Sequence, residues 1–321
     1  MSSLIVIGGS GFFGKSILDF YVRGGLEKWN VNHLILASRD PDILKEECPN
    51  LLKSNGVELL KLDITNCTQI PKAQFVIHAA ASTDASNYVN FSEREKKNIL
   101  IGTENFCSLA KKNLKDSKII YVSSGAVYGQ QSENISHISE NMPLLPIESM
   151  PQNKRDYASA KRDSELLIKK LEEYELSVSI ARCFAFVGPW LPRNKHFAVG
   201  NFIESVKNKT PIIVNSNNLV LRSYMHADDL VEWLMEICSN SRIDCPIYNV
   251  GSEDEVSIQF IAKLFAEKYD LELKIPVKCR NNNVDRYIPS TKKARDELSL
   301  IQKTNTKDAL EKTINDVCKF Y

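Results

Sequence analysis

Tyr157 and Lys161 stand four residues apart in the stretch YASAK, a spacing that places both side chains on one face of a helix. Ser124 closes the apolar run KIIYVSS, which is typical of a buried strand. A free tyrosine titrates near pH ~10, and a neighbouring ammonium favours its phenolate form. A serine hydroxyl can hydrogen-bond an oxygen that changes between hydroxyl and carbonyl. Together these three side chains could transfer a proton to or from such an oxygen.

A glycine-rich stretch near the N-terminus, GGSGFFGKS, fits three patterns. Gly9 to Ser16 satisfies the P-loop pattern G-x-x-x-x-G-K-[ST]. The same letters satisfy the dinucleotide-binding pattern G-x-G-x-x-G from Gly9, and also G-x-x-G-x-x-G from Gly8. A glycine turn between a strand and a helix exposes backbone N–H groups at a positive helix terminus, which suits any phosphate. The stretch alone therefore does not separate these alternatives.

The first half of the chain alternates short β-branched runs with longer helical stretches. This alternation predicts an α/β fold with a Rossmann-type, doubly wound parallel sheet, whose ligands bind beyond the carboxyl ends of the strands. Residues 1–185 are expected to form this domain together with about 223–260, while 186–222 and 261–321 form a smaller, mixed α/β substrate-binding cap. The strands are expected at 4–8, 33–38, 57–63, 75–81, 118–124 and 177–184, with helices at about 12–23 and 93–113 and from Tyr157.

Residues at the ends of the second and third predicted strands help to distinguish a P-loop enzyme from a dinucleotide-binding protein. A P-loop enzyme needs an acid at the end of a second apolar strand for magnesium, and Asp63 is a weak match. A dinucleotide binder needs a polar discriminator at the tip of its second strand, where Ser38 and Arg39 stand. An acid there would bind the ribose of NAD, whereas a small residue followed by Arg suits the 2′-phosphate of NADP. An ordinary exposed loop charge is the alternative for Arg39.

In order and spacing, the motifs of this chain resemble those of the extended short-chain dehydrogenase/reductase family, the nucleotide-sugar epimerases, dehydratases and reductases. The likeness covers nearly the whole chain, and the motifs taken together favour it over a P-loop enzyme. The matching stretches are GGSGFFG (8–14), LDIT (62–65), HAAA (78–81), SSGAVYG (123–129), YASAK (157–161), RCFAFVGP (182–189), RSYMHADDL (222–230), YNVG (248–251) and DRYIPSTKKA (285–294).

The resemblance implies a role for each matching residue. Ser124, Tyr157 and Lys161 would form a catalytic triad, with Lys161 also holding the nicotinamide ribose. The dinucleotide would contact Gly8, Gly11, Phe12, Phe13, Gly14, Ser38, Arg39, Asp63, Ile64, Ala79, Ala80, Ala81, Tyr157 and Lys161. A nucleoside-diphosphate sugar would contact Ser124, Asn201, Phe202, Arg222 and Arg286, with the two arginines at its diphosphate. For His226 and Asp228 we expect packing and helix capping.

Departures from the family pattern reduce the number of reactions that the chain is expected to catalyse. The 4,6-dehydratases of the family usually carry Asp-Glu directly after the catalytic Ser or Thr, as acid and base for the loss of water. Gly125 and Ala126 stand there instead and have no titratable group, so dehydration is disfavoured. Family members also often carry an Asn at the position of Ala185, where it touches the sugar nucleotide, and its absence leaves the sugar open.

Two enzymatic hypotheses remain. In the first, NADPH gives hydride to a ketone of a nucleoside-diphosphate keto-sugar, with C4 favoured, and Tyr157 protonates the oxyanion. In the second, a tightly held NAD oxidises the C4 hydroxyl and hydride returns to the other face, which makes a 4-epimerase; the oxidised nicotinamide would then favour phenolate at Tyr157. Ser38 and Arg39 favour NADPH and the reductase. A dinucleotide-binding scaffold or sensor is the non-enzyme alternative, and the intact triad counts against it.

The composition of the chain argues against several classes of binding partner. A net charge of +1 over 321 residues supplies no general attraction to nucleic acid or to an anionic membrane. The apolar run 4–8 is too short for a signal-peptide core or a membrane span. Eight cysteines and five histidines are scattered without metal-ligand spacing, so we expect no metal site and buried, reduced thiols in a cytosolic protein. The resemblance further implies a homodimer, joined through a helix pair that includes the helix of Tyr157.

Overall fold

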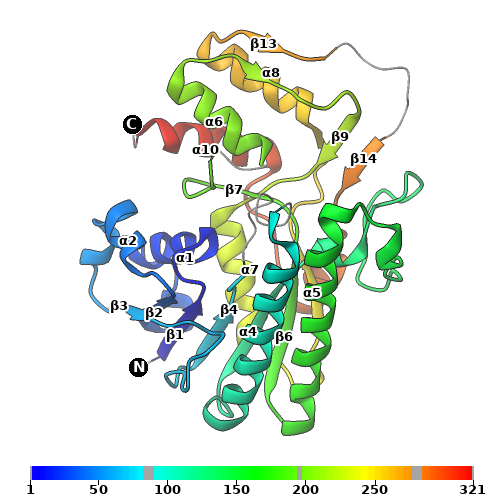
Figure 1. Ribbon diagram of the computed structural model, residues 1–321. Coiled ribbons are helices and arrows are strands. Elements are labelled where there is room, and N and C mark those ends of the chain that lie inside the picture. The colour runs from blue at the N-terminus through cyan, green and yellow to red at the C-terminus, as the bar shows by residue number, and fades with distance from the viewer. Residues whose placement is uncertain (1, 82–89, 194–196, 277–283, 320–321) are drawn as a thin grey trace.

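The computed structural model describes residues 2–81, 90–193, 197–276 and 284–319. Seven parallel strands form the central sheet, in the order β11-β6-β5-β4-β1-β2-β3. The order reverses between β1 and β4, which confirms the predicted Rossmann-type, doubly wound sheet (Figure 1). The strands are β1 (Ser2–Ile7), β2 (Val31–Ser38), β3 (Val57–Lys61), β4 (Phe75–His78), β5 (Lys118–Ser124), β6 (Ser177–Cys183) and β11 (Ile247–Val250).

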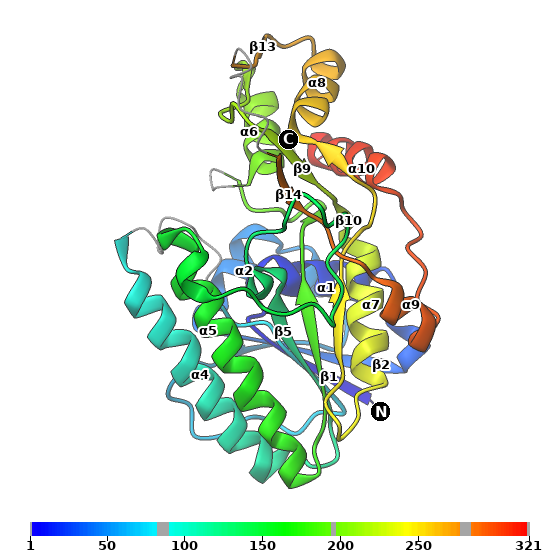
Figure 2. The same cartoon turned by 90° about the vertical axis from the view of Figure 1, so that its right-hand side faces the viewer.

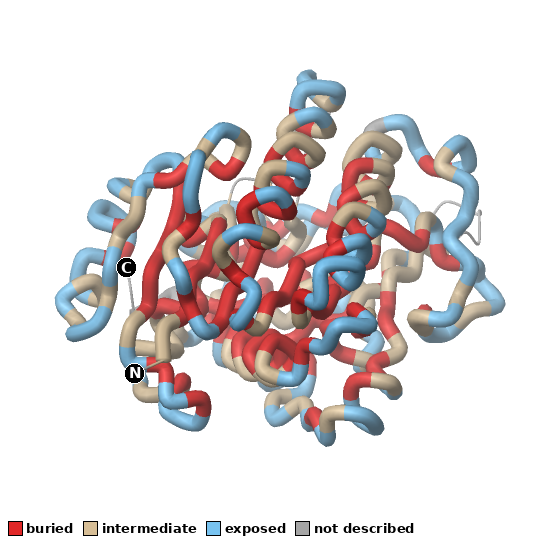
Figure 3. Tube along the Cα trace, turned by 90° about the horizontal axis from the view of Figure 1, so that it is seen from below, coloured by how far each residue is buried: buried red, intermediate tan, exposed pale blue. Residues whose placement is uncertain are grey.

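Helices cover both faces of this sheet, which is why its central strands β1 and β4 are almost entirely buried. Along β1, Leu4 and Val6 pack in a core with α1 and α7, whereas Ile5 and Ile7 pack in a second core with α4 and α5. Figure 2 shows α4 and α5 on one side of the sheet and α7 on the other, and Figure 3 shows the strands buried between them. The helices are α1 (Phe12–Val22), α2 (Asp42–Glu47), α4 (Ser92–Asn113), α5 (Gln152–Lys169) and α7 (Ala227–Ser239).

The remaining elements contribute mostly to a cap with a core of its own. Phe202 and Phe265 pack together there, with ring centroids 5.8 Å apart. A three-stranded sheet of order β12-β9-β14 belongs to this part of the chain. The elements are β7 (Phe186–Val187), α6 (Ala198–Asn208), β8 (Ile212–Ile213), β9 (Leu219–Arg222), β10 (Met225–His226), β12 (Val256–Ser257), α8 (Ile258–Tyr269), β13 (Leu273–Lys274), β14 (Val284–Tyr287), α9 (Lys292–Leu298) and α10 (Thr306–Lys319).

The cap has a core of its own, but two residues pack otherwise than the predicted boundaries imply, which placed Ile258 with the sheet domain and Ala294 in the cap. Ile258 and Phe265 of α8 pack in the cap core, while Ala294 of α9 packs in the sheet core beside α1 and α7. The chain therefore passes between the two parts more than once after β6. Figures 1 and 2 show α6, α8 and α10 together, at the end of the molecule away from the lower ends of α4 and α5.

The cysteines described by the structure are free thiols. Cys67 is half-buried, and the others are buried: Cys48, Cys107, Cys183, Cys238 and Cys245. Burial raises the pKa of Cys48 to about 11, so this thiol is neutral and poorly nucleophilic. Cys279 and the side chain of Cys318 lie outside what the structure describes.

Candidate active site

The glycine turn between β1 and α1 depends on glycines that leave no room for a side chain. Gly8 has a φ of +97°, and a Cβ on it would lie 2.8 Å from the carbonyl oxygen of Ala79. A Cβ on Gly14 would lie 2.0 Å from the carbonyl oxygen of Gly9, so only glycine lets α1 pack so closely against the turn. A Cβ on Gly11 would meet only the Gly8 oxygen, at 3.4 Å. Gly11 is therefore the position of the turn that a ligand can approach.

The N-terminus of α1 is suited to a phosphate. Gly11 is its N-cap residue, no described side chain caps it, and its first turn contains no acid. The free N–H groups and the positive end of the helix dipole both favour an anion. The rings of Phe12 and Phe13 turn into the protein, where Phe13 packs edge-on against Phe186 with centroids 5.7 Å apart. Both residues are only partly buried, and their backbone N–H groups lie in the first turn of α1, where a dinucleotide is expected.

The remaining P-loop residues are engaged elsewhere. Lys15 forms an ion pair with Glu47 of α2, and Ser16 is buried with 3% of its surface exposed. Asp63 accepts hydrogen bonds from the backbone N–H and the hydroxyl of Thr65, at 3.0 and 2.8 Å. Lys15 and Asp63 therefore have partners within the protein, and Ser16 is buried. The P-loop roles of binding a triphosphate and magnesium are not needed to explain these three residues.

Two further strand ends carry predicted dinucleotide contacts. At the tip of β2, Ser38 is buried and its hydroxyl accepts a hydrogen bond from the backbone of Asp40 at 3.1 Å. Arg39 is exposed and forms no ion pair with the residues that the structure describes. Past β3, buried Ile64 lies in a loop fixed by Asn105 of α4, which donates to the Ile64 carbonyl oxygen at 3.0 Å.

The end of β4 connects the glycine turn to the predicted triad. The Ala79 N–H donates to the Ile7 carbonyl oxygen at 2.8 Å, directly before Gly8. Ala80 follows, half-buried, and Ala81 packs in one small cluster with Tyr157. Ala79–Ala81 therefore runs from the turn to the phenol, which is the course expected for a bound dinucleotide.

The structure brings Ser124, Tyr157 and Lys161 together. Ser124 ends β5, and its hydroxyl accepts a hydrogen bond from the Ala126 N–H at 3.1 Å. The Ser124 hydroxyl is also hydrogen-bonded to the Tyr157 phenol, one helical turn before Lys161 on α5. The Lys161 ammonium is buried and donates to the Val122 carbonyl oxygen at 2.8 Å. Serine, phenol and ammonium thus lie together at the carboxyl edge of the sheet, where they could transfer a proton.

Burial controls the protonation of this unit. Burial raises the pKa of Tyr157 above its ordinary value, and the Lys161 ammonium and the Ser124 hydroxyl only partly oppose it. The expectation that the ammonium favours phenolate is therefore right in direction, but burial outweighs it. The phenol is protonated at neutral pH and able to donate. Nearby, burial and the Lys161 charge lower the pKa of His78 to about 3, so that imidazole is neutral.

A second phenol, from the cap, also reaches Ser124. The Tyr287 hydroxyl is hydrogen-bonded to the Ser124 hydroxyl, and its ring packs on Phe184 with centroids 4.6 Å apart. A Cβ on Gly125 would lie 2.6 Å from the Tyr287 oxygen. Burial raises the pKa of Tyr287, so this phenol is neutral as well. Sequence reasoning missed Tyr287, although it stands next to Arg286 in a matching stretch, because its contact depends on how the cap folds back.

A buried ion pair lies next to the residues that carry the triad. Glu165 and Arg182 pair at 2.6 Å with only 7% of each side chain exposed, and the Ser123 hydroxyl donates to Glu165 at 2.5 Å. Glu165 lies one turn after Lys161, and Ser123 directly precedes Ser124. Removing one member would leave a buried charge without its partner, which is strongly destabilising. A charged residue within the apolar strand SVSIARCF was the available signal for this pair.

The predicted sugar-nucleotide residues do not all gather at one place. The register pairs Arg222 of β9 with Tyr287 of β14 and Leu221 with Arg286. Because side chains alternate along a strand, Arg222 lies on the face of Tyr287 and Arg286 on the opposite face. Arg286 pairs there with Glu255 at 2.7 Å.

The two predicted contacts on α6 differ in exposure. Asn201 is exposed, whereas Phe202 is 2% exposed inside the cap core. The packing of Phe202 against Phe265 accounts for its burial and leaves its side chain no surface for a sugar.

The family follows from comparison with known proteins. The model of the NAD dependent epimerase/dehydratase family matches residues 4–251, a span that includes the glycine turn and the triad. The chain belongs to that family. This confirms the resemblance on which the site residues above were assigned.

Individual members of the epimerase/dehydratase family are only distantly similar to this chain. A dTDP-D-glucose 4,6-dehydratase of Dictyostelium discoideum is 26% identical over an alignment that covers 82% of this chain. The same alignment covers 61% of the length of the dehydratase. A putative UDP-glucose 4-epimerase of Methanocaldococcus jannaschii is 24% identical over 97% of both chains. The solved structure of MoeE5 in complex with UDP-glucuronic acid and NAD superposes with a TM-score of 0.79 over the whole of both chains at 18% identity, which shows the shared fold.

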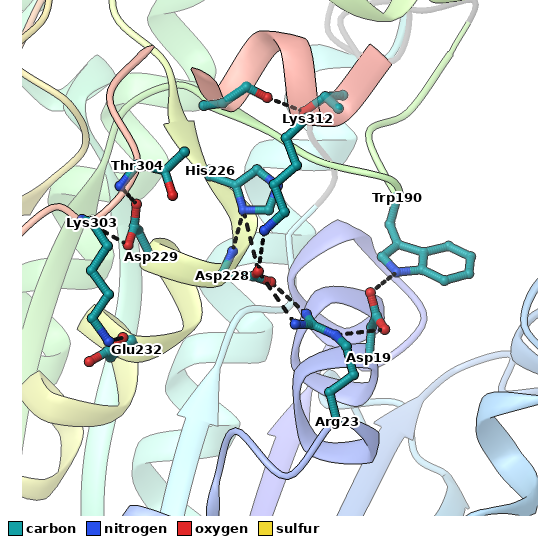
Figure 4. A network of polar contacts seen from close by, with 12 residues as sticks. Asp19, Arg23, Trp190, His226, Asp228, Asp229, Glu232, Lys303, Thr304 and Lys312 are labelled. Carbon is teal, nitrogen blue, oxygen red and sulfur yellow. Dashed lines mark hydrogen bonds and ion pairs between the residues drawn. The ribbon is translucent and has the colours of Figure 1, made fainter. Parts of the chain in front are cut away.

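In this member of the epimerase/dehydratase family, a polar network connects α10 of the cap to α1 and α7 beside the sheet (Figure 4). His226 caps α7 by accepting the Asp228 N–H at 3.1 Å, which confirms the expected capping role. The Asp228 carboxylate accepts from Arg23 of α1 at 2.6 Å and from Lys312 of α10 at 2.7 Å. Burial lowers the pKa of His226 to about 4, so it caps the helix as a neutral ring. The network therefore has a structural role at the junction of α1, α7 and α10.

The described ranges contain neither a candidate membrane span nor a candidate metal cluster. The helices in those ranges are too short or too polar to cross a membrane. In the same part of the chain, His, Cys, Asp and Glu side chains form no group of three or more that could hold a metal ion.

Proposed function

We propose that the protein reduces a ketone of a nucleoside-diphosphate keto-sugar with NADPH, with C4 as the favoured carbon. The observation that carries this proposal is the protonated Tyr157 phenol, hydrogen-bonded to Ser124 with the Lys161 ammonium nearby. Reduction of a ketone needs an acid at the carbonyl oxygen, and a neutral phenol in a buried site is such an acid. Membership of the epimerase/dehydratase family supports a nucleotide sugar as the substrate.

The residues present fit a dinucleotide. The open position at Gly11 and the uncapped N-terminus of α1 would receive its pyrophosphate. When bound, NADPH supplies the hydride. Ser124 would hold the ketone oxygen by a hydrogen bond, Tyr157 would donate its proton to that oxygen, and Lys161 would stabilise the phenolate that remains.

The space beside Ser124 supports reduction or epimerisation over dehydration. An acidic side chain at position 125 would begin 2.6 Å from the Tyr287 oxygen, so it could not enter unless Tyr287 moved. Where the dehydratases of the family carry Asp-Glu, this chain has Gly125 and Ala126, and the Tyr287 hydroxyl takes up the space beside Gly125. A 4-epimerase with tightly bound NAD remains the alternative, because the triad serves both reactions.

The preference for NADPH rests on Arg39. Its guanidinium is exposed at the tip of β2 and free of ion pairs within the described residues, as a group that binds a 2′-phosphate should be. We expect Arg39→Ala to weaken NADPH binding about 10-fold or more through the loss of charge-assisted hydrogen bonds, and to leave NADH binding nearly unchanged. Fluorescence titration of both cofactors measures this difference. Equal losses for NADPH and NADH would remove the reason for preferring the reductase.

The reaction itself is tested with a 4-keto-6-deoxy sugar nucleotide. The purified protein should oxidise NADPH faster than NADH, and mass spectrometry should find a product heavier by two hydrogens. Conversion of a sugar nucleotide without added cofactor, to a product of unchanged mass, would establish the epimerase instead. Binding of NADPH without turnover of any sugar nucleotide would favour the scaffold.

We also propose that the protein is a cytosolic homodimer joined across α4 and α5. Leu166 of α5 is 62% exposed and would be covered by a helix of the second copy. The free thiols support a reducing compartment. Light scattering should then give twice the chain mass of 36.3 kDa, and Leu166→Glu should shift it towards the monomer.

A further inference from the structure

Arg222 is held by an acidic residue on the neighbouring strand. Its Nη2 pairs with Asp285 Oδ2 at 2.8 Å, and its Nη1 donates to the carbonyl oxygens of Leu221 and Asp285, each at 2.8 Å. Asp285 precedes Tyr287 by two residues on β14, and Tyr287 is the register partner of Arg222. The alternation of side chains therefore places Arg222, Asp285 and Tyr287 on one face of the three-stranded cap sheet.

That face is the one that meets the reacting centre, because the Tyr287 hydroxyl is hydrogen-bonded to Ser124. A nucleotide sugar with its ketone oxygen at Ser124 would extend along Tyr287 and bring its diphosphate towards Arg222. The anion would then need the guanidinium that Asp285 already occupies. The Asp285 carboxylate and the diphosphate cannot accept hydrogen bonds from the same Arg222 N–H groups at the same time.

We propose that Asp285 competes with the diphosphate of the substrate for Arg222, so that the carboxylate occupies the anion site until the substrate displaces it. This inference rests on the proposed function, since it takes the ligand to be a nucleoside diphosphate. The Arg222 side chain is 20% exposed, and that of Asp285 is 42% exposed. The carboxylate can therefore turn into solvent while the arginine stays in place.

The exchange is energetically reasonable. An ion pair with a partly exposed carboxylate is weak, whereas a diphosphate offers several oxygens to the planar guanidinium. The competition lowers the affinity for substrate and for product alike, which helps the product to leave. The ion pair also holds the Arg222 side chain on the face of the cap sheet that carries Tyr287.

The test is calorimetric titration of the full chain with UDP, dTDP and inorganic pyrophosphate. Asp285→Asn should tighten the binding of these probes about 5- to 10-fold, because one negative charge next to the anion is removed. Asp244→Asn is the matched control, since it makes the same change in an Asp–Arg pair outside the cap, with Arg242 at 3.0 Å, and should change nothing. In an Arg222→Ala background the gain from Asp285→Asn should disappear.

The possible results are distinct. Unchanged or weaker binding by Asp285→Asn, with normal binding by the wild type, would overturn the competition and leave the proposed function intact. Persistence of the gain in affinity in the Arg222→Ala background, or its reproduction by Asp244→Asn, would attribute the gain to the change in net charge. Either result would also overturn the competition. No binding of any probe by either protein would overturn both proposals. Melting temperatures confirm folding, and Asp285→Ser repeats the test with a smaller side chain.

Discussion

Tyr157→Phe is expected to lower kcat for the reduction by about 100- to 10,000-fold, the usual contribution of a positioned proton donor. The ring of phenylalanine keeps the packing against Ala81 and Ala160, so only the hydroxyl next to Ser124 is lost. NADPH should bind nearly as before, because its pyrophosphate lies at the glycine turn. Steady-state kinetics and a cofactor titration on the same preparation measure the two effects.

Tyr287→Phe is the matched control for this prediction. It removes the other phenol that is hydrogen-bonded to Ser124, so each variant leaves one of the two hydroxyls in place. We expect a loss of about 10-fold, since a neutral hydrogen bond that positions the serine is worth about 1 kcal/mol. A larger loss for Tyr287→Phe than for Tyr157→Phe would make Tyr287 the acid.

The pH dependence of the reduction follows from the raised pKa of Tyr157. Burial favours its neutral form, and the reduced nicotinamide carries no positive charge that would oppose this. The acid is therefore present at neutral pH and is lost only as the pH rises through its raised pKa. We expect kcat to stay level between about pH 7 and 9 and to fall above about pH 10. A rate that climbs steadily over the lower range would instead indicate a phenolate base.

Gly11→Ala is expected to weaken NADPH binding about 10- to 100-fold, through the loss of a charge-assisted hydrogen bond to the pyrophosphate. The new Cβ would meet only the Gly8 oxygen, at 3.4 Å, and so the free energy of unfolding should hardly change. The methyl group would occupy the space through which the anion approaches the N-terminus of α1. Titration with NADPH and thermal unfolding separate the two effects.

Gly14→Ala gives the contrasting result. Its Cβ would lie 2.0 Å from the Gly9 oxygen, so α1 would have to move away from the turn. We expect the free energy of unfolding to fall by about 3 kcal/mol, as for other overpacked sites, together with cofactor affinity. If Gly11→Ala bound NADPH like the wild type, the pyrophosphate would have to lie elsewhere.

Local sequence signals predicted much of the fold and the centre of the site. The alternation of β-branched and helical runs predicted the parallel sheet, and the spacing of Tyr157 and Lys161 placed them on one face of α5. The apolar runs fixed the strands to within a few residues, although 75–81 and 57–63 were predicted too long, since β4 ends at His78 and β3 at Lys61. The residue directly after each strand still donates one hydrogen bond to the neighbouring strand, from Leu62 to Ser38 and from Ala79 to Ile7, but the pairing stops there. Period and propensity do not reveal where pairing stops.

Contacts between the cap and the sheet were beyond the reach of sequence reasoning. Tyr287 reaches Ser124 across more than 160 residues, and no local pattern of β-branched or charged residues reports such a contact. The same limit applies to Arg286, which shares a motif with Tyr287 but lies on the other face of its strand. Phe202 was expected at the sugar because of its place in the chain, and its burial depends on Phe265 in α8.

The hydroxyl pair at Ser124 is assembled from two distant segments, and the later one lies beyond residue 251, where the family match ends. A fragment that stops at that residue would retain the glycine turn, the serine and the first tyrosine, yet it would lack the second. Adding residues 252–321 back as a separate peptide should then restore turnover in proportion to how well the two pieces associate. Because residues 252–321 also supply Phe265 to the cap core and Ala294 to the sheet core, the regained oxidation of NADPH would report the rebuilding of both cores as well as of the hydroxyl pair.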